Sequence, residues 1–136
     1  MLVSVRVLNA SSQFLPGIQY DRRVWFQTIT SASVTSQVTT LTALNVAVPP
    51  SAKVWYGWAS INTTASINAQ VNVASDANGT GNQQVAGGVS TTGSGSTNGG
   101  ALGPIPITTP QTVYWSALLS SGTFTQAKLF TSGYEF

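Results

Sequence analysis

Apolar and polar residues alternate with a period of two along much of this chain of 136 residues. The clearest run is residues 66–74, in which one face would carry Ile67, Ala69, Val71 and Val73. Successive side chains of a strand point to opposite faces, so this pattern predicts an antiparallel strand with one buried and one wet face. The same pattern predicts strands at residues 3–7 and near the end, where one parity holds Lys128, Phe130, Ser132, Tyr134 and Phe136.

Three shorter runs, at residues 24–26, 54–58 and 113–115, combine β-branched and aromatic residues. Such clusters are typical of central strands whose two faces are both covered. Turn signals such as Pro49-Pro50 and Asn78-Gly79 fall between the runs. Residues 34–44 show some helical spacing, but their threonines favour one or two strands. The sequence therefore predicts an all-β single domain over residues 1–136, a β-sandwich or jelly roll of about seven to eight antiparallel strands.

A Gly/Ser/Thr-rich tract occupies residues 87–103, with Leu102 as its one large side chain. A stretch of this composition predicts a long surface loop. Such a loop is either a simple flexible connection or a segment that becomes ordered against a neighbouring subunit or a ligand.

The composition excludes several kinds of chemistry. The chain has no histidine and no cysteine, which removes thiol nucleophiles, disulfides, Cys/His zinc sites and histidine acid–base catalysis. Only 6% of the residues are charged, and five scattered cations are too dilute to follow a nucleic-acid backbone. No apolar stretch approaches the roughly 20 residues of a membrane span. We therefore expect no enzymatic activity, no cofactor, no metal, no nucleic-acid partner and no membrane insertion.

The chain has three carboxylates, Asp21, Asp76 and Glu135. A glycosidase needs two of them facing each other across a cleft. Asp21 precedes two arginines, and a local ion pair is the simpler interpretation. Asp76 opens an oxygen-rich run that superficially resembles a calcium loop, but calcium prefers several carboxylates. A β-turn built on Asn78-Gly79 explains that run better.

The largest side chains offer candidate contact residues. Trp55 and Trp58 differ in parity and so should point to opposite faces of a strand. One of them would then be core, and the other would lie at the surface or in an interface. Core packing, subunit contact and ligand stacking remain open for each aromatic residue. The candidate interface or ligand-stacking residues are Trp25, Trp55, Tyr56, Trp58 and Trp115.

Three segments resemble known proteins: residues 48–59 (VPPSAKVWYGWA), 106–115 (PITTPQTVYW) and 131–136 (TSGYEF). The first resembles a proline-to-strand opening, the second a Pro-Gln turn that feeds an aromatic strand, and the third a closing Gly-aromatic strand. In this the chain is similar to small bacteriophage virion structural proteins and to the C-terminal β-domains of phage tail fibres. The first 44 residues carry no such similarity.

The resemblance implies a β-sandwich or jelly-roll protomer, often a homotrimer, exposed on the virion as a fibre, spike or capsid-decoration protein. Its partners would be copies of itself and other virion proteins of the capsid or tail. We expect the strand of Val3, Val5 and Val7 to attach the protein by adding to a neighbour's sheet edge. The alternative is a host-glycan-binding, receptor-binding module that uses the tryptophans and the tract at residues 87–103. A weaker alternative is a bacterial surface adhesin.

Overall fold

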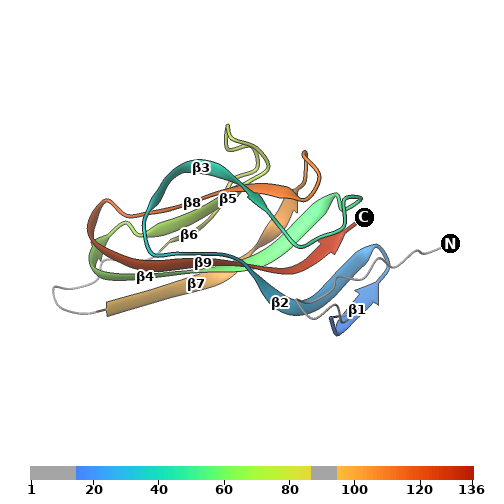
Figure 1. The fold of residues 1–136 in the computed structure, drawn as a ribbon, viewed down its shortest axis with the longest axis horizontal. Coiled ribbons are helices and arrows are strands. Elements are labelled where there is room, and N and C mark those ends of the chain that lie inside the picture. The colour runs from blue at the N-terminus through green and yellow to red at the C-terminus, as the bar shows by residue number, and fades with distance from the viewer. Residues whose placement is uncertain (1–14, 87–94) are drawn as a thin grey trace.

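The protein folds into two antiparallel β-sheets, seen in a computed structural model that describes residues 15–86 and 95–136 (Figure 1). The strands are β1 (Gly17–Tyr20), β2 (Arg23–Val34), β3 (Val38–Asn45), β4 (Val54–Ile67), β5 (Gln70–Ala74), β6 (Gln83–Ala86), β7 (Gly95–Pro106), β8 (Thr112–Leu118) and β9 (Ser121–Glu135). The described ranges thus hold nine strands, more than the seven to eight expected. No helix in these ranges is long and apolar enough to cross a membrane.

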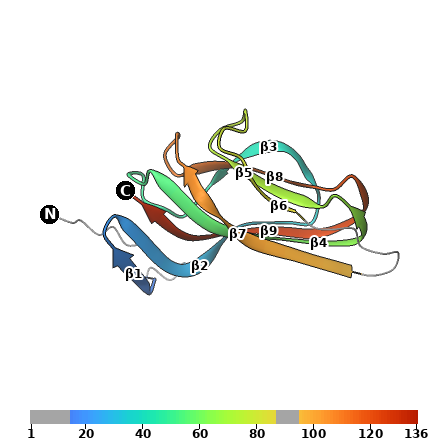
Figure 2. The ribbon, with the colours of Figure 1, turned by 180° about the vertical axis from the view of Figure 1, so that it is seen from behind.

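The two sheets pack face to face as a sandwich, which confirms the predicted fold class (Figures 1 and 2). One sheet has five strands in the order β1-β2-β9-β4-β7, and the other has four in the order β3-β8-β5-β6. The β1–β2 hairpin lies at one end of the molecule, close to the C-terminal end of β9 (Figure 1). We call the side of the five-stranded sheet that faces away from the other sheet its outer face.

The core lies between the sheets and contains side chains from both. Its largest fully buried member is Trp55 of β4, which packs in one cluster with residues of β5, β8 and β9. The indole Nε1 of Trp55 donates a hydrogen bond of 2.8 Å to Oγ1 of Thr131, which also pairs with the Ser31 hydroxyl at 2.7 Å. The polar atoms of this part of the core are therefore satisfied, as buried polar groups must be.

Residues 66–74 do not form the single strand that their alternation predicts. β4 ends at Ile67, β5 begins at Gln70, and the two strands belong to different sheets. Asn68 adopts a positive φ of 52°, a conformation that asparagine tolerates in turns. Because the chain changes sheets here, Ile67 is 44% exposed although Val71 and Val73 are buried as expected.

The shared parity expected for residues 128–136 is also wrong. A register shift falls between Thr131 and Gly133, where β9 pairs with both β2 and β4. The extra residue of such a bulge reverses the alternation beyond it. Phe130 therefore stays partly exposed, whereas Tyr134 is 1% exposed and belongs to the core.

The prediction of a long loop at residues 87–103 is wrong for the second half of that range. Gly95–Pro106 forms β7, the edge strand of the five-stranded sheet, which pairs with β4 along most of its length. Residues 87–94 lie outside the described part of the chain. The expected attachment residues Val3, Val5 and Val7 lie outside it as well.

Candidate functional site

The β1–β2 hairpin presents a row of large side chains on the outer face. Its register places Ile18 opposite Trp25 and Tyr20 opposite Arg23. Directly opposite residues of an antiparallel pair point to the same side, so all four share one face. Ile18 is 74% exposed and Tyr20 is 81% exposed. Asp21 makes the turn possible with a positive φ of 53°.

Trp25 lies across β9 and packs against Tyr56 of β4, with 5.0 Å between the ring centroids. The residue of β9 between them in the register is Gly133. A Cβ on Gly133 would lie 2.9 Å from a ring atom of Trp25, so only glycine leaves room for this arrangement. Trp25 remains 39% exposed, while Tyr56 is buried beneath its neighbours.

Charged groups meet beside these rings. Arg23 forms an ion pair of 3.3 Å with Glu135, and the Tyr56 hydroxyl donates a 3.0 Å hydrogen bond to the same carboxylate oxygen. The Arg23 guanidinium also lies 4.6 Å from the Tyr56 ring centroid and 5.7 Å from that of Trp25. Burial and the Glu135 carboxylate raise the pKa of Tyr56 above its ordinary value of 10.0. The ion pair expected at Asp21 instead joins Arg23 to Glu135.

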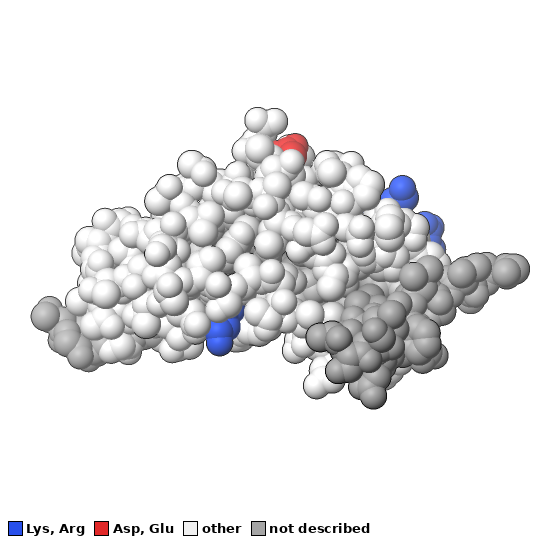
Figure 3. Space-filling view, in the orientation of Figure 1, with Lys and Arg blue, Asp and Glu red and all other residues white. Residues whose placement is uncertain are grey.

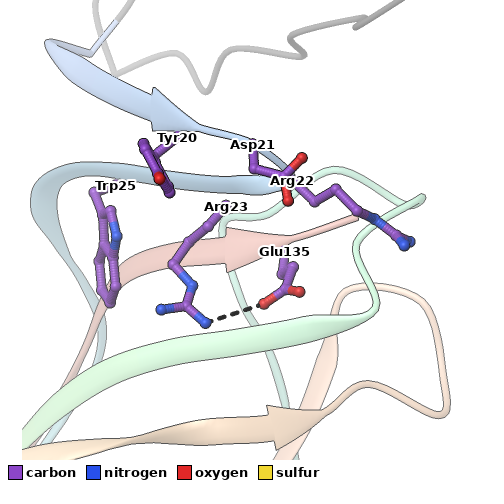
Figure 4. Close-up of a pocket in the computed structure, with 6 residues that line it drawn as sticks. All are labelled: Tyr20, Asp21, Arg22, Arg23, Trp25 and Glu135. Carbon is purple, nitrogen blue, oxygen red and sulfur yellow. Dashed lines mark hydrogen bonds and ion pairs between the residues drawn. The ribbon is translucent and has the colours of Figure 1, made fainter.

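These groups surround an open cavity of about 400 Å³ (Figure 4). Its lining consists of Tyr20, Asp21, Arg22, Arg23, Trp25 and Glu135. Half of the eight charged side chains of the whole chain are in this lining. Arg22 points away from the others, and its Nε donates to the backbone oxygen of Phe136 (Figure 4). We call this group of six residues the hairpin cavity.

A second aromatic cluster lies nearer the middle of the outer face. The rings of Trp58 and Phe130 are 5.5 Å apart, and Trp58 is 40% exposed. A Cβ on Gly99 of β7 would come within 2.5 Å of the Trp58 ring, so the indole lies on the backbone of that glycine. We call Trp58, Phe130 and Gly99 the Trp58 patch. Charged side chains are few on the side of the molecule that Figure 3 shows.

The structure divides the five candidate aromatic residues. Trp55 and Trp115 are 0% and 4% exposed and lie in the core, so neither can contact a ligand or a partner. Trp25 and Trp58 reach the surface, and Tyr56 supports Trp25 from below. The opposite orientation of Trp55 and Trp58 is as predicted.

Sequence reasoning did not find Tyr20, Arg23 and Glu135 as members of a site. The alternation of residues 18–25 around Asp21-Arg22 is a hairpin signal that would have placed the first two on one face. Glu135 has no such local signal. It reaches the site only because β9 pairs with β2, which brings together residues 112 positions apart.

Asp76 holds a turn, as its sequence context indicates. One carboxylate oxygen accepts hydrogen bonds from the backbone N–H groups of Asn78 at 2.9 Å and Thr80 at 3.1 Å. Hydrogen bonds, those from Thr80 foremost, lower the pKa of Asp76. Gly79 supplies the positive φ of 83°. Among residues 15–86 and 95–136, no three potential metal-binding side chains come together.

Comparison with known proteins finds no matching family model and no curated protein of similar sequence.

Proposed function

We propose that this chain is a non-enzymatic structural protein of a bacteriophage particle, exposed as a fibre, spike or decoration protein. It assembles as a homotrimer and binds other virion proteins of the capsid or tail. The observation that carries the proposal is the Trp58 patch, an exposed aromatic cluster on the outer face of the five-stranded sheet. A second copy of the chain is its occupant.

The surroundings of the Trp58 patch suit a contact between proteins. The outward positions that follow Trp58 along β4 are the neutral polar residues Ser60, Asn62 and Thr64. Buried aromatic side chains supply much of the binding energy at protein interfaces. Burying neutral neighbours costs less than burying unpaired charges. Lys128 lies on the same face, opposite Ser60 in the register, so a second copy that covers the patch must leave the Lys128 ammonium group hydrated or pair it.

The local structure of the three phage-like segments also supports the proposal. β4 follows the Pro49-Pro50 pair, as the first segment implies. The turn at Pro110-Gln111, in which Gln111 has a φ of 57°, leads directly into β8. The closing segment supplies the last residues of β9, including Gly133 beneath Trp25. The first and third segments thus contribute to the five-stranded sheet that carries the Trp58 patch, whereas β8 of the second belongs to the other sheet.

The virion location is tested on particles. Phage particles purified from the host that carries this gene are expected to contain the chain, detected as peptides by mass spectrometry. Antibodies raised against the purified protein should decorate the particle surface in electron micrographs. Particles that are infectious and lack the chain would refute the proposal.

The assembly contact is tested by light scattering. The wild-type protein is expected at about 42 kDa, three times the chain mass of 14.1 kDa. Trp58→Ala should shift the mass toward a single chain because it removes the centre of the apolar contact. Trp25→Ala is the matched control, since Trp25 is equally exposed on the same face and should leave the trimer intact. A monomeric wild type, or equal effects of the two variants, would contradict the contact.

A further inference from the structure

The hairpin cavity combines an aromatic wall with a fixed polar floor. Trp25 is held in place from below by Tyr56 and by the backbone at Gly133, and its exposed part borders the cavity. Tyr20 lies on the neighbouring strand and is the most exposed large hydrophobic side chain of the described ranges. The volume of about 400 Å³ falls within the range of small-ligand pockets.

The polar groups are oriented before any ligand arrives. Glu135 is held by Arg23 and by the Tyr56 hydroxyl, and Arg23 is also packed against the Tyr56 ring. A guanidinium has five N–H donors in a rigid plane, more than one carboxylate can accept. The pair therefore offers both donors and acceptors in fixed positions, and a ligand loses little of its affinity to ordering the site.

The charges of the lining determine whether the hairpin cavity favours an anionic, a cationic or a neutral ligand. The lining contains two arginines and two carboxylates, so its residues carry no net formal charge. An anion would be attracted by Arg23 but repelled by Glu135 at 3.3 Å from it. A cation would compete with Arg23, which already occupies the face of Tyr56. A neutral molecule with many hydroxyl groups and one apolar face fits both the polar pair and the aromatic wall.

We propose that the hairpin cavity binds a neutral sugar residue of an oligosaccharide or polysaccharide. The C–H face of the sugar ring packs on Trp25 and Tyr20, and its hydroxyls hydrogen-bond to Arg23 and Glu135. The cavity is open, so the rest of the saccharide chain extends into solvent. This site goes beyond the assembly role proposed above and does not depend on it, because it uses a different part of the outer face.

The test is an NMR titration of the full chain with short neutral oligosaccharides of glucose, mannose or galactose, and with oligogalacturonate as an acidic comparison. At least one neutral oligosaccharide is expected to bind, with amide shifts concentrated at Tyr20, Arg23 and Trp25. Trp25→Ala should weaken that binding about tenfold or more. Trp58→Ala, matched in exposure and on the same face, should leave the affinity within about twofold.

A second variant separates loss of binding from loss of folding. Tyr20→Ala changes a side chain that is 81% exposed and should weaken binding about threefold or more without altering the melting temperature. No binding of any neutral probe up to about 5 mM would overturn the proposal. Tighter binding of oligogalacturonate, or full affinity in Tyr20→Ala and Trp25→Ala, would overturn it as well.

Discussion

Two tryptophans of the outer face each lie on a glycine of a neighbouring strand. Trp58 covers Gly99, and Trp25 covers Gly133. A glycine in a strand lacks a side chain to pack, and an aromatic ring from the next strand can replace that packing. The rings thereby lie against the backbone of the sheet yet remain 39–40% exposed. Each surface aromatic cluster thus depends on a pair of residues, a tryptophan and a glycine that leaves room for its ring.

This dependence limits what the sequence could predict about the site. Parity was enough to place Trp55 and Trp58 on opposite faces, because a strand alternates strictly between them. Parity could not tell which face the second sheet covers. The role of Gly133 could not be predicted either, because this glycine makes room for Trp25, which lies more than a hundred positions away in the sequence.

Trp55→Phe should destabilise the protein by about 2–3 kcal/mol. The substitution removes the indole N–H that donates to Thr131 and leaves a gap in a fully buried position. Urea denaturation followed by circular dichroism measures the free energy of unfolding. Trp58→Phe is the control, and because Trp58 is 40% exposed it should cost no more than about 0.5 kcal/mol. Equal losses in the two variants would contradict the assignment of Trp55 to the core.

At the scale of elements, periodicity predicted where strands would lie better than where they would end. The alternation at residues 70–74 and the aromatic run at residues 113–115 lie within β5 and β8. The errors arose where the backbone interrupts the alternation. Asn68 turns the chain into the other sheet, and the bulge before Gly133 reverses the parity of β9. Neither the turn nor the bulge changes the hydrophobic pattern enough to be predicted from the sequence.

The strand β7 was missed for a different reason. Its glycines and asparagine have a low intrinsic preference for a strand, so composition indicated a loop. Pairing with β4 and cover from Trp58 stabilise the strand instead. The context of the sheet overrides the local preference here, as it commonly does for strands.

The edge strands β6 and β7, which belong to different sheets, are joined by one side chain. Oε1 of Gln83 accepts a 2.7 Å hydrogen bond from the Gly103 N–H, and its Nε2 donates a 3.1 Å bond to the Pro104 carbonyl. The amide of Gln83 thus pairs with β7 as a backbone amide of a neighbouring strand would. This contact bridges the edge strands of the two sheets on one side of the sandwich.

Gln83→Ala should cost about 1 kcal/mol and speed hydrogen exchange of the Gly103 amide about tenfold. The substitution leaves that N–H without its side-chain acceptor. Exchange rates are measured by NMR in deuterated buffer. The control is Gln84→Ala, because the side chain of Gln84 is exposed and hydrogen-bonds to that of Gln70 on the paired strand β5. Unchanged exchange at Gly103 in Gln83→Ala would show that the contact does not hold β7.

At the scale of the whole molecule, the titration behaviour is unusually simple. The chain has no histidine and no cysteine, so no side chain of ordinary pKa changes charge between about pH 5.5 and 8.5. Burial raises the pKa of Tyr134, and burial together with Glu135 raises that of Tyr56. Hydrogen bonds lower the pKa of Asp76. Stability should therefore depend on pH only toward the two extremes.

The melting temperature is expected to be nearly constant from about pH 5.5 to 8.5 and to fall above about pH 10. A raised tyrosine pKa stabilises the fold while the unfolded tyrosine is still protonated, and this contribution is lost as the pH rises through the folded value. The contribution of Asp76 is present above its usual pKa of 3.8 and is lost as the pH falls below it. Scanning calorimetry across this range checks the profile, and Tyr56→Phe should reduce the alkaline fall. A midpoint of destabilisation near pH 7 would contradict it.

The position of β9 in the five-stranded sheet governs when that sheet can form. β9 lies between β2 and β4, and in the described chain it is the last strand to be synthesised. Until residues 121–135 have left the ribosome, β2 and β4 each lack the neighbour that occupies the centre of the sheet. Unpaired strand edges invite association with other chains, and distant pairings are slow to form. The nascent chain is thus most prone to associate with other chains while β2 and β4 are made and residues 121–135 have not yet emerged.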